Sequence, residues 1–200
     1  MLKLGHIVGL QVQRSALKLA SAPGAANGRY YDPAALLSVE QLELTASGVR
    51  GLVEAGEPVI DVHHVHHPTS KNVANANGMS VGFTAHYACM RERFGPHLVD
   101  GIAGENVLVA VDNQVAPERL LDGLDIALQD GRRVHLEHII VAEPCLEFTR
   151  YALRLDPLQP GGEAATAGLQ FLRHGMRGFY VSYLGEPAVL SVGDAVFAPA

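Results

Sequence analysis

RVHLEHIIVAEPCLEFTR, residues 133–150, passes from a strand pattern to a helix pattern within a single stretch. The β-rich run breaks at Pro144, presents Cys145 and then turns helical. Backbone N–H groups at a helix start are unpaired, and the helix dipole favours an anion there. A thiol at this position is expected to be available as the thiolate, the nucleophilic and metal-binding form. The alternative is that Cys145 is a small buried hydrophobic residue, because free cysteine is often buried.

The segments on both sides of this stretch favour β-structure. Leu124–Leu128 and Arg133–Val141 flank Asp130-Gly131, which is a strong hairpin signal. Leu36–Thr45 is ambiguous between helix and strand, and its second half is interpreted as a strand. Further strands are predicted from alternation or β-branched runs at His6–Gln13, Val59–His66, Asn106–Val111, Gly178–Leu184, Ala188–Leu190 and Ala195–Ala198.

Helices are fewer and shorter. Apolar residues recur at helical spacing from Phe83 to Phe94 and predict an amphipathic helix that ends at Gly95-Pro96. Shorter helical segments are predicted at Pro117–Asp122, Leu146–Leu153 and Leu169–His174, and loops at 75–80 and at 157–168, the latter a Pro/Gly/Ala-rich mobile loop. The fold class is therefore mainly β: a barrel with a few peripheral short helices, in one domain over residues 1–200.

Composition narrows the class of protein. The chain has 200 residues and a net charge of −6 without a basic block, which disfavours a nucleic-acid partner. Two cysteines make no disulfide framework, so a reducing, cytoplasmic setting is expected. No apolar run approaches the roughly 20 residues that cross a bilayer, and no signal peptide is recognised at the N-terminus, so no membrane partner is expected.

A dense group of histidines follows the strand predicted at Val59. It reads Asp61-Val62-His63-His64-Val65-His66-His67. Two histidines and a carboxylate on one strand face could hold a divalent metal such as zinc, although a further ligand would have to come from elsewhere. The same residues could instead donate hydrogen bonds to an anionic ligand, or be polar residues at the rim of a sheet.

A second candidate is Gly101–Asn106, GIAGEN, directly before a strand. Its glycines would let the backbone approach a ligand closely, and Glu105 and Asn106 could fix that ligand by hydrogen bonds. Glu105 could equally accept hydrogen bonds from backbone N–H groups of a tight turn. The sequence contains no nucleophile elbow, P-loop or dinucleotide fingerprint.

Four stretches in this order resemble the MOSC family, domains related to the C-terminal part of molybdenum cofactor sulfurases. They are the Asp-then-His-His stretch at Asp61–His67, the Gly-Glu-Asn segment at Ala103–Val107, the Pro-Cys segment at Glu143–Cys145, and the closing strand, turn and Gly-Asp at Gly175–Asp194. The family usually has Gly-Gly after the histidine pair and Phe before Gly-Glu-Asn, whereas this chain has Val65-His66 and Ala103.

The resemblance implies a β-barrel with a cleft for a molybdenum–pterin cofactor or a sulfur-bearing species. Cys145 would ligate molybdenum or carry a sulfane sulfur. Glu105 and Asn106 would shape the site, and His64 and His67 would line it. Five residues near the motifs are candidates for contacts to a cofactor phosphate: Arg14, Ser15, Lys71, Asn72 and Arg177. The alternative is that each is an ordinary surface residue.

Three functions follow as hypotheses. The first is a molybdenum-cofactor-dependent reductase of N-hydroxylated small molecules, supplied with electrons by a separate donor protein because the chain has no flavin or iron–sulfur pattern. The second is a carrier module that holds a persulfide on Cys145 or delivers the cofactor. The third is a zinc protein that uses His63–His67, and a fold that has lost its cofactor is a further possibility.

Overall fold

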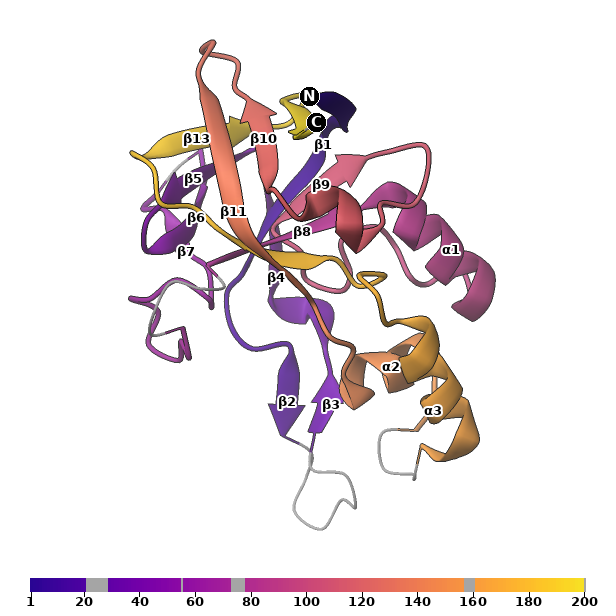
Figure 1. Ribbon diagram of the computed structural model, residues 1–200. Helices are drawn as coiled ribbons and strands as arrows, with labels where there is room; N and C mark the ends of the chain where they lie inside the picture. Colours follow the sequence, from indigo (N-terminus) through magenta and orange to yellow (C-terminus); the bar gives the residue numbers. More distant parts are fainter. Residues whose placement is uncertain (21–28, 55, 73–77, 157–160, 200) are drawn as a thin grey trace.

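A closed β-barrel of seven strands organises the computed structural model, which describes residues 1–20, 29–54, 56–72, 78–156 and 161–199 (Figure 1). Around the barrel the order is β14-β10-β11-β12-β8-β9-β1, and β1 pairs with β14 to close it. The strands are β1 (Leu2–Gln13), β8 (Met79–Phe83), β9 (Val107–Ala110), β10 (Leu124–Ala127), β11 (Arg133–Val141), β12 (Phe179–Ser182) and β14 (Ala195–Ala198). Every neighbouring pair is antiparallel except β8 and β9, which are parallel.

Alternating apolar residues fill the barrel. In β11, Val134 and Leu136 are buried, whereas Arg133 and His135, which alternate with them, are exposed. Phe83 is fully buried in the same core. Successive strand residues point to opposite faces, so each apolar set lies inside. Burying each large side chain contributes about 1.5–3 kcal/mol relative to leaving it exposed.

The predicted hairpin at Asp130-Gly131 is confirmed. Leu124 pairs with Leu136, and the Arg132 amide donates to Asp130 Oδ1 at 2.9 Å in the turn. Gly131 has φ +88°, which glycine adopts without strain. β11 pairs with β12 on both sides of His138, which has φ +51° and lies where the register shifts between Glu137 and Ile140.

A smaller four-stranded sheet, β13-β5-β6-β7, lies against one side of the barrel (Figure 1). Its strands are β5 (Gln41–Thr45), β6 (Gly48–Leu52), β7 (Val59–Ile60) and β13 (Ala188–Ser191). The ambiguous stretch 36–45 forms two strands, β4 (Leu36–Val39) on β1 and β5 on β13. Leu42 and Leu44 of β5 are fully buried and join the barrel core.

Three short helices and a two-stranded ribbon surround one end of the barrel. The helices are α1 (Thr84–Phe94), α2 (Leu146–Ala152) and α3 (Gly162–Phe171), with 3-10 turns η1 (Pro33–Ala35) and η2 (Pro117–Leu120), and the ribbon pairs β2 (Lys18–Ala20) with β3 (Arg29–Tyr31). Figure 1 shows α2 and α3 side by side next to β3. Tyr87 and Met90 of α1 and Phe148 of α2 belong to a second buried apolar cluster.

The predicted amphipathic helix is thereby confirmed. α1 buries Tyr87 and Met90 and ends at Gly95, which has φ +115°. No helix of the described residues is long and apolar enough to cross a membrane.

Three predictions of secondary structure were wrong. The strand expected at Val59–His66 stops at Ile60, because Asp61 Oδ1 accepts the His63 amide at 2.9 Å and turns the backbone away from the ladder. Met79 and Ser80 begin β8 rather than closing the loop expected at 75–80, of which residues 75–77 lie outside the described residues.

The loop expected at 157–168 is also corrected, since Gly162–Phe171 forms α3. Alanines at the centre of the segment favour helix strongly, and Glu163 lies in the first turn, where the helix dipole favours an anion. Residues 157–160 lie outside the described residues.

Candidate functional site

A pocket of about 350 Å³ opens between the β2–β3 ribbon, the histidine-rich turn and the start of β12. We call it the Arg177 pocket. Its walls are formed by Gln13, Ala16, Leu17, Lys18, Arg29, Tyr31, Val62, His63, Thr69, Lys71, Ala103, Glu143, Arg177 and Tyr180. These residues come from separate parts of the chain, so the fold assembles the pocket.

Cys145 lies next to this pocket, immediately before α2. The residue is half-buried, has extended backbone and caps the helix, as the sequence predicted. Arg177 Nη1 donates to Cys145 Sγ at 3.6 Å. Two charged groups therefore adjoin the thiol: the Arg177 guanidinium and the carboxylate of Glu147, which also forms a side-chain hydrogen bond with Cys145.

Arg177 is buried, and its guanidinium contacts an aromatic ring and a backbone carbonyl. Its guanidinium lies over the Phe148 ring, 4.6 Å from the ring centroid. Nη2 donates to the Ala103 carbonyl oxygen at 3.2 Å, whereas Nε has no partner among the described residues. An Arg177 cation in this position favours an anionic ligand beside it.

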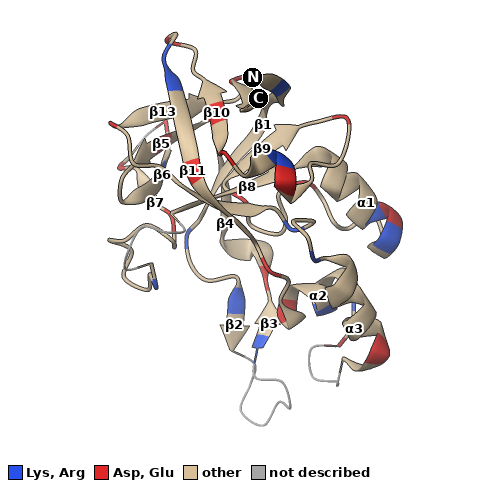
Figure 2. Ribbon diagram, in the orientation of Figure 1, with Lys and Arg blue, Asp and Glu red and all other residues tan. Residues whose placement is uncertain are grey.

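Cations outnumber carboxylates on the pocket walls. Lys18, Arg29, Lys71 and Arg177 face the acidic Glu143. Figure 2 shows Lys and Arg colouring on both β2 and β3, next to this pocket. The excess of positive charge suits an anionic ligand.

Two tyrosines on the walls can act as hydrogen-bond donors. Burial raises the pKa of both Tyr31 and Tyr180 above the usual tyrosine value, so both hydroxyls remain protonated. The Tyr31 hydroxyl donates to the Ile102 carbonyl oxygen at 2.6 Å. Tyr180 is therefore the more available of these two donors.

Glu105 lies behind the pocket wall rather than on it. It is only 4% exposed, Oε2 accepts the Tyr87 hydroxyl at 2.6 Å, and Oε1 has no partner among the described residues. A Cβ on Gly82 would come within 2.8 Å of Glu105 Cγ, so glycine at that position makes room for the carboxyl. Burial raises the pKa of Glu105.

Asn106 joins three segments of the chain inside the protein. Its Oδ1 accepts the Ser80 amide at 2.9 Å, and Nδ2 donates to Asp61 Oδ2 at 2.8 Å. Asp61 Oδ2 also accepts the Gln13 amide at 2.7 Å. Burial alone would raise the pKa of Asp61, but its hydrogen bonds with His63 and Gln13 outweigh burial and lower it. Asn106 and Asp61 are fully buried, so Asn106 supports the fold and does not line the pocket.

The histidines turn their ring nitrogens toward protein groups. His64 Nδ1 accepts the His66 amide at 3.2 Å, and burial lowers the pKa of His64. His67 Nε2 pairs with the Arg14 carbonyl oxygen at 3.2 Å. Within the described part of the chain, no group of three or more His, Cys, Asp or Glu side chains is placed to hold a metal ion. The described residues therefore offer no ligand set for the zinc hypothesis at His63–His67.

The other residues predicted to contact a cofactor lie in three places. Lys71 and Arg177 line the pocket. Asn72 Nδ2 donates to the His63 carbonyl oxygen at 2.9 Å and supports the turn. Arg14 and Ser15 line a separate surface hollow.

Sequence reasoning missed Lys18, Arg29, Tyr31 and Tyr180. Lys18 and Arg29 lie on either side of residues 21–28, which are outside the described residues and whose sequence carries only a general loop composition without a hairpin signal. The basic residues on either side of this segment were the available signal.

Comparisons with known proteins support the fold. No protein-family model matches the chain, and no curated protein matches it. Among solved structures, the YuaD protein from Bacillus subtilis superposes with a TM-score of 0.52 and 13% identity over 96% of this chain and 97% of that one. YiiM from Escherichia coli gives 0.50 and 12% over 82% of this chain and 65% of that one, and a hypothetical protein gives 0.53 and 13% over 98% and 67%.

The chain therefore shares its closed β-barrel fold with YuaD and YiiM. At these identities the likeness is one of fold alone. The function has to be argued from the pocket and from Cys145.

Proposed function

We propose that this chain binds the molybdenum cofactor in the Arg177 pocket, with Cys145 as the molybdenum ligand, and reduces N-hydroxylated small molecules. The observation that carries the proposal is the 3.6 Å contact between Arg177 Nη1 and Cys145 Sγ beside a basic pocket. A soft thiolate suits molybdenum better than a hard oxygen ligand would.

The donors around the pocket fit the anionic part of such a cofactor. Lys18 and Lys71 are exposed cations on its walls, and Arg177 has a buried Nε without a partner among the described residues. Lysine and arginine are the usual partners of phosphate groups. Arg29 adds a further guanidinium, although it also pairs with Glu147 at 3.0 Å.

The cofactor, when bound, supplies the exchange of two electrons. The protein holds Cys145 Sγ beside Arg177 and presents protonated tyrosine hydroxyls at the pocket wall. Reduction of R–NHOH consumes two electrons and two protons, breaks the N–O bond and releases R–NH₂ and water. A separate electron-donor protein would supply the electrons, and solvent at the open pocket would supply the protons.

The test is elemental analysis of protein produced in a host replete with molybdenum. The unaltered chain should carry molybdenum, Cys145→Ala should lose it, and Cys89→Ala should keep it, because Cys89 lies on α1 away from the pocket. Equal molybdenum in Cys145→Ala and the unaltered chain would exclude Cys145 as the ligand. Turnover of a hydroxylamine with a chemical reductant would then test the reductase step.

A persulfide carrier is the second candidate, favoured by the half-buried, accessible position of Cys145 beside a cation. The Cys145 thiolate would attack the outer sulfur of a donor persulfide, forming a new S–S bond while the donor S–S bond breaks and the donor thiolate leaves. Cyanide-labile sulfur on Cys145 after incubation with such a donor supports this candidate, and its absence contradicts it.

A further inference from the structure

A second cavity, of about 330 Å³, lies between β3, α2 and the segment that follows α1. We call it the Arg150 pocket. Arg29 and Tyr31 line both pockets, and the buried Phe148 ring contacts Arg177 of the first as well as Tyr31 and Tyr151 of the second. The two cavities are therefore neighbours with a common aromatic wall.

The Arg150 pocket carries an excess of positive charge. Arg29, Arg150 and Arg154 line it, against the carboxylate of Glu147. Glu147 Oε1 lies 3.0 Å from Arg29 Nη2, so this ion pair leaves two guanidinium groups without a carboxylate on the pocket wall. This balance favours an anionic ligand.

Arg150 is the decisive residue. It is only 3% exposed, and its Nε has no hydrogen-bond partner among the described residues. Leaving a buried donor unsatisfied is unfavourable, and more so when the group is charged. A ligand oxygen that accepts from Arg150 would remove this cost.

The remaining wall is largely aromatic. Tyr30, Tyr31, Tyr151 and Leu155 line the cavity, and the rings of Tyr31 and Tyr151 lie 5.3 Å apart at an angle of 53°. Tilted aromatic pairs of this kind present ring faces and edges against which another ring can pack. The pocket therefore combines an anion anchor with an aromatic wall.

We propose that the Arg150 pocket binds a small aromatic carboxylate. Its carboxylate accepts hydrogen bonds from the Arg150 guanidinium, and its ring packs against Tyr31 and Tyr151. Arginine and carboxylate groups match geometrically through paired N–H···O bonds, which gives selectivity over a neutral amide of the same shape. The site does not require the Cys145 cofactor.

The first test compares three probes on the unaltered protein by titration calorimetry: benzoate, benzamide and inorganic phosphate. Benzoate should bind at least about tenfold more tightly than benzamide, because loss of the charged pair is worth more than about 1.4 kcal/mol. Phosphate should bind more weakly than benzoate because it has no ring. Equal binding of benzoate and benzamide, or tightest binding of phosphate, would overturn the proposal. Because the chain has no tryptophan, tyrosine fluorescence provides a second readout.

Variants locate the site. Arg150→Met should abolish benzoate binding, and Arg119→Ala, a matched loss of an exposed arginine on η2, should leave it unchanged. If Arg150→Met does not fold, Arg154→Ala removes an exposed guanidinium of the same wall and should weaken benzoate but not benzamide. Unchanged benzoate affinity in a folded Arg150→Met, or in Arg154→Ala if the former does not fold, contradicts the proposal. Cys145→Ala should retain benzoate binding, which separates this site from the proposed cofactor function.

Discussion

The Tyr87 hydroxyl donates to Glu105 Oε2 at 2.6 Å, deep between α1 and the barrel. The same hydroxyl accepts the Ala103 amide at 3.0 Å, so one phenol holds both the carboxyl and the loop that forms part of the pocket wall. Glu105 is thus a buried acid that is linked to the pocket through its neighbours.

This relationship predicts a pH effect for Glu105→Gln. Burial raises the folded-state pKa of Glu105, so the folded chain retains a proton that the unfolded chain releases. The stability that this proton contributes is present below the unfolded value of about 4.5 and is lost as pH rises through the raised pKa. Denaturant titrations from pH 5 to pH 8 should show Glu105→Gln gaining stability relative to the unaltered chain. A difference that stays constant with pH would contradict this assignment.

Removing the donor should have the opposite consequence. Tyr87→Phe leaves a buried carboxyl with one fewer partner and should lower the free energy of unfolding by about 1–3 kcal/mol. Tyr30→Phe, at a residue outside both buried clusters, is the matched control and should stay within about 0.5 kcal/mol. Urea unfolding measures both variants, and equal effects would show that the Tyr87 hydroxyl is not required.

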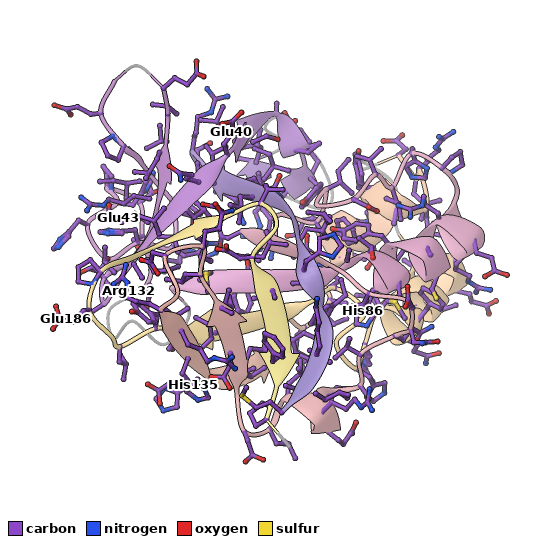
Figure 3. All side chains as sticks on the ribbon, turned by 90° about the horizontal axis from the view of Figure 1, so that it is seen from above. Glu40, Glu43, His86, Arg132, His135 and Glu186 are labelled. Carbon is purple, nitrogen blue, oxygen red and sulfur yellow. The ribbon has the colours of Figure 1, made fainter. Side chains whose placement is uncertain are left out.

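His86 connects two loops to the first turns of α1 (Figure 3). Its Nε2 accepts the Val115 amide at 3.0 Å, so Nδ1 carries the hydrogen and donates to the Gly175 carbonyl oxygen at 3.0 Å. Burial lowers the pKa of His86. The unfolded chain therefore takes up a proton first as pH falls, and stability present above the unfolded value of about 6.5 is lost below it.

The prediction is that thermal stability falls from pH 7 to pH 5 by more in the unaltered chain than in His86→Gln. The glutamine variant should start lower at pH 7, by about 1–3 kcal/mol, because its amide cannot reproduce both loop bonds. His135→Gln, which changes a half-exposed histidine paired with Asp125, is the comparison. If the thermal stability of the unaltered chain and of His86→Gln changes with pH in parallel, His86 is not responsible for the loss of stability at low pH.

Asn106 provides a prediction that separates support of the fold from contact with a ligand. Asn106→Ala leaves Asp61 Oδ2 and the Ser80 amide without their amide partner and should cost about 2–4 kcal/mol, two buried bonds at about 1–2 each. Asn113→Ala, at an exposed position, should cost less than about 0.5 kcal/mol. Unfolding by guanidinium chloride measures the loss of stability in both variants. Full stability in Asn106→Ala would instead favour a direct contact with a ligand.

Cys145 and Asn106 differ in how much of their position could be predicted from the sequence. The sequence placed Cys145 correctly at the start of a helix because a strand pattern precedes Pro144 and a helical pattern follows Cys145, and both are local features; the strand itself ends earlier, at Val141. The barrel followed from alternating strands and the Asp130-Gly131 turn for the same reason. Whether Asn106 faced a ligand or Asp61, 45 residues away, depended on strand order, which no local pattern encodes.

The strand prediction for the histidine-rich segment was wrong for a related reason. Its alternation predicted a strand, but Asp61 Oδ1 accepts a hydrogen bond from the His63 amide, two residues later. The β-propensity of the segment does not predict this side-chain hydrogen bond. Lys18 and Arg29 reach the pocket through a short ribbon whose pairing could not be deduced from composition. The cationic character of the site was therefore visible only after folding.

The final prediction concerns the reactivity of Cys145. In a Cys89→Ala background Cys145 is the remaining cysteine, and Arg177→Met removes the guanidinium that contacts Sγ at 3.6 Å while keeping an apolar side chain over Phe148. Alkylation by iodoacetamide at pH 7 should slow by roughly three- to tenfold, because an adjacent cation stabilises the reactive thiolate. Arg177→Lys should recover part of the rate, since it restores the charge without the planar fork. Arg173→Met, an exposed arginine after α3, should not change the rate. Equal rates in Arg177→Met and its parent would show that Cys145 does not depend on Arg177, and the proposed thiolate site would lose its support.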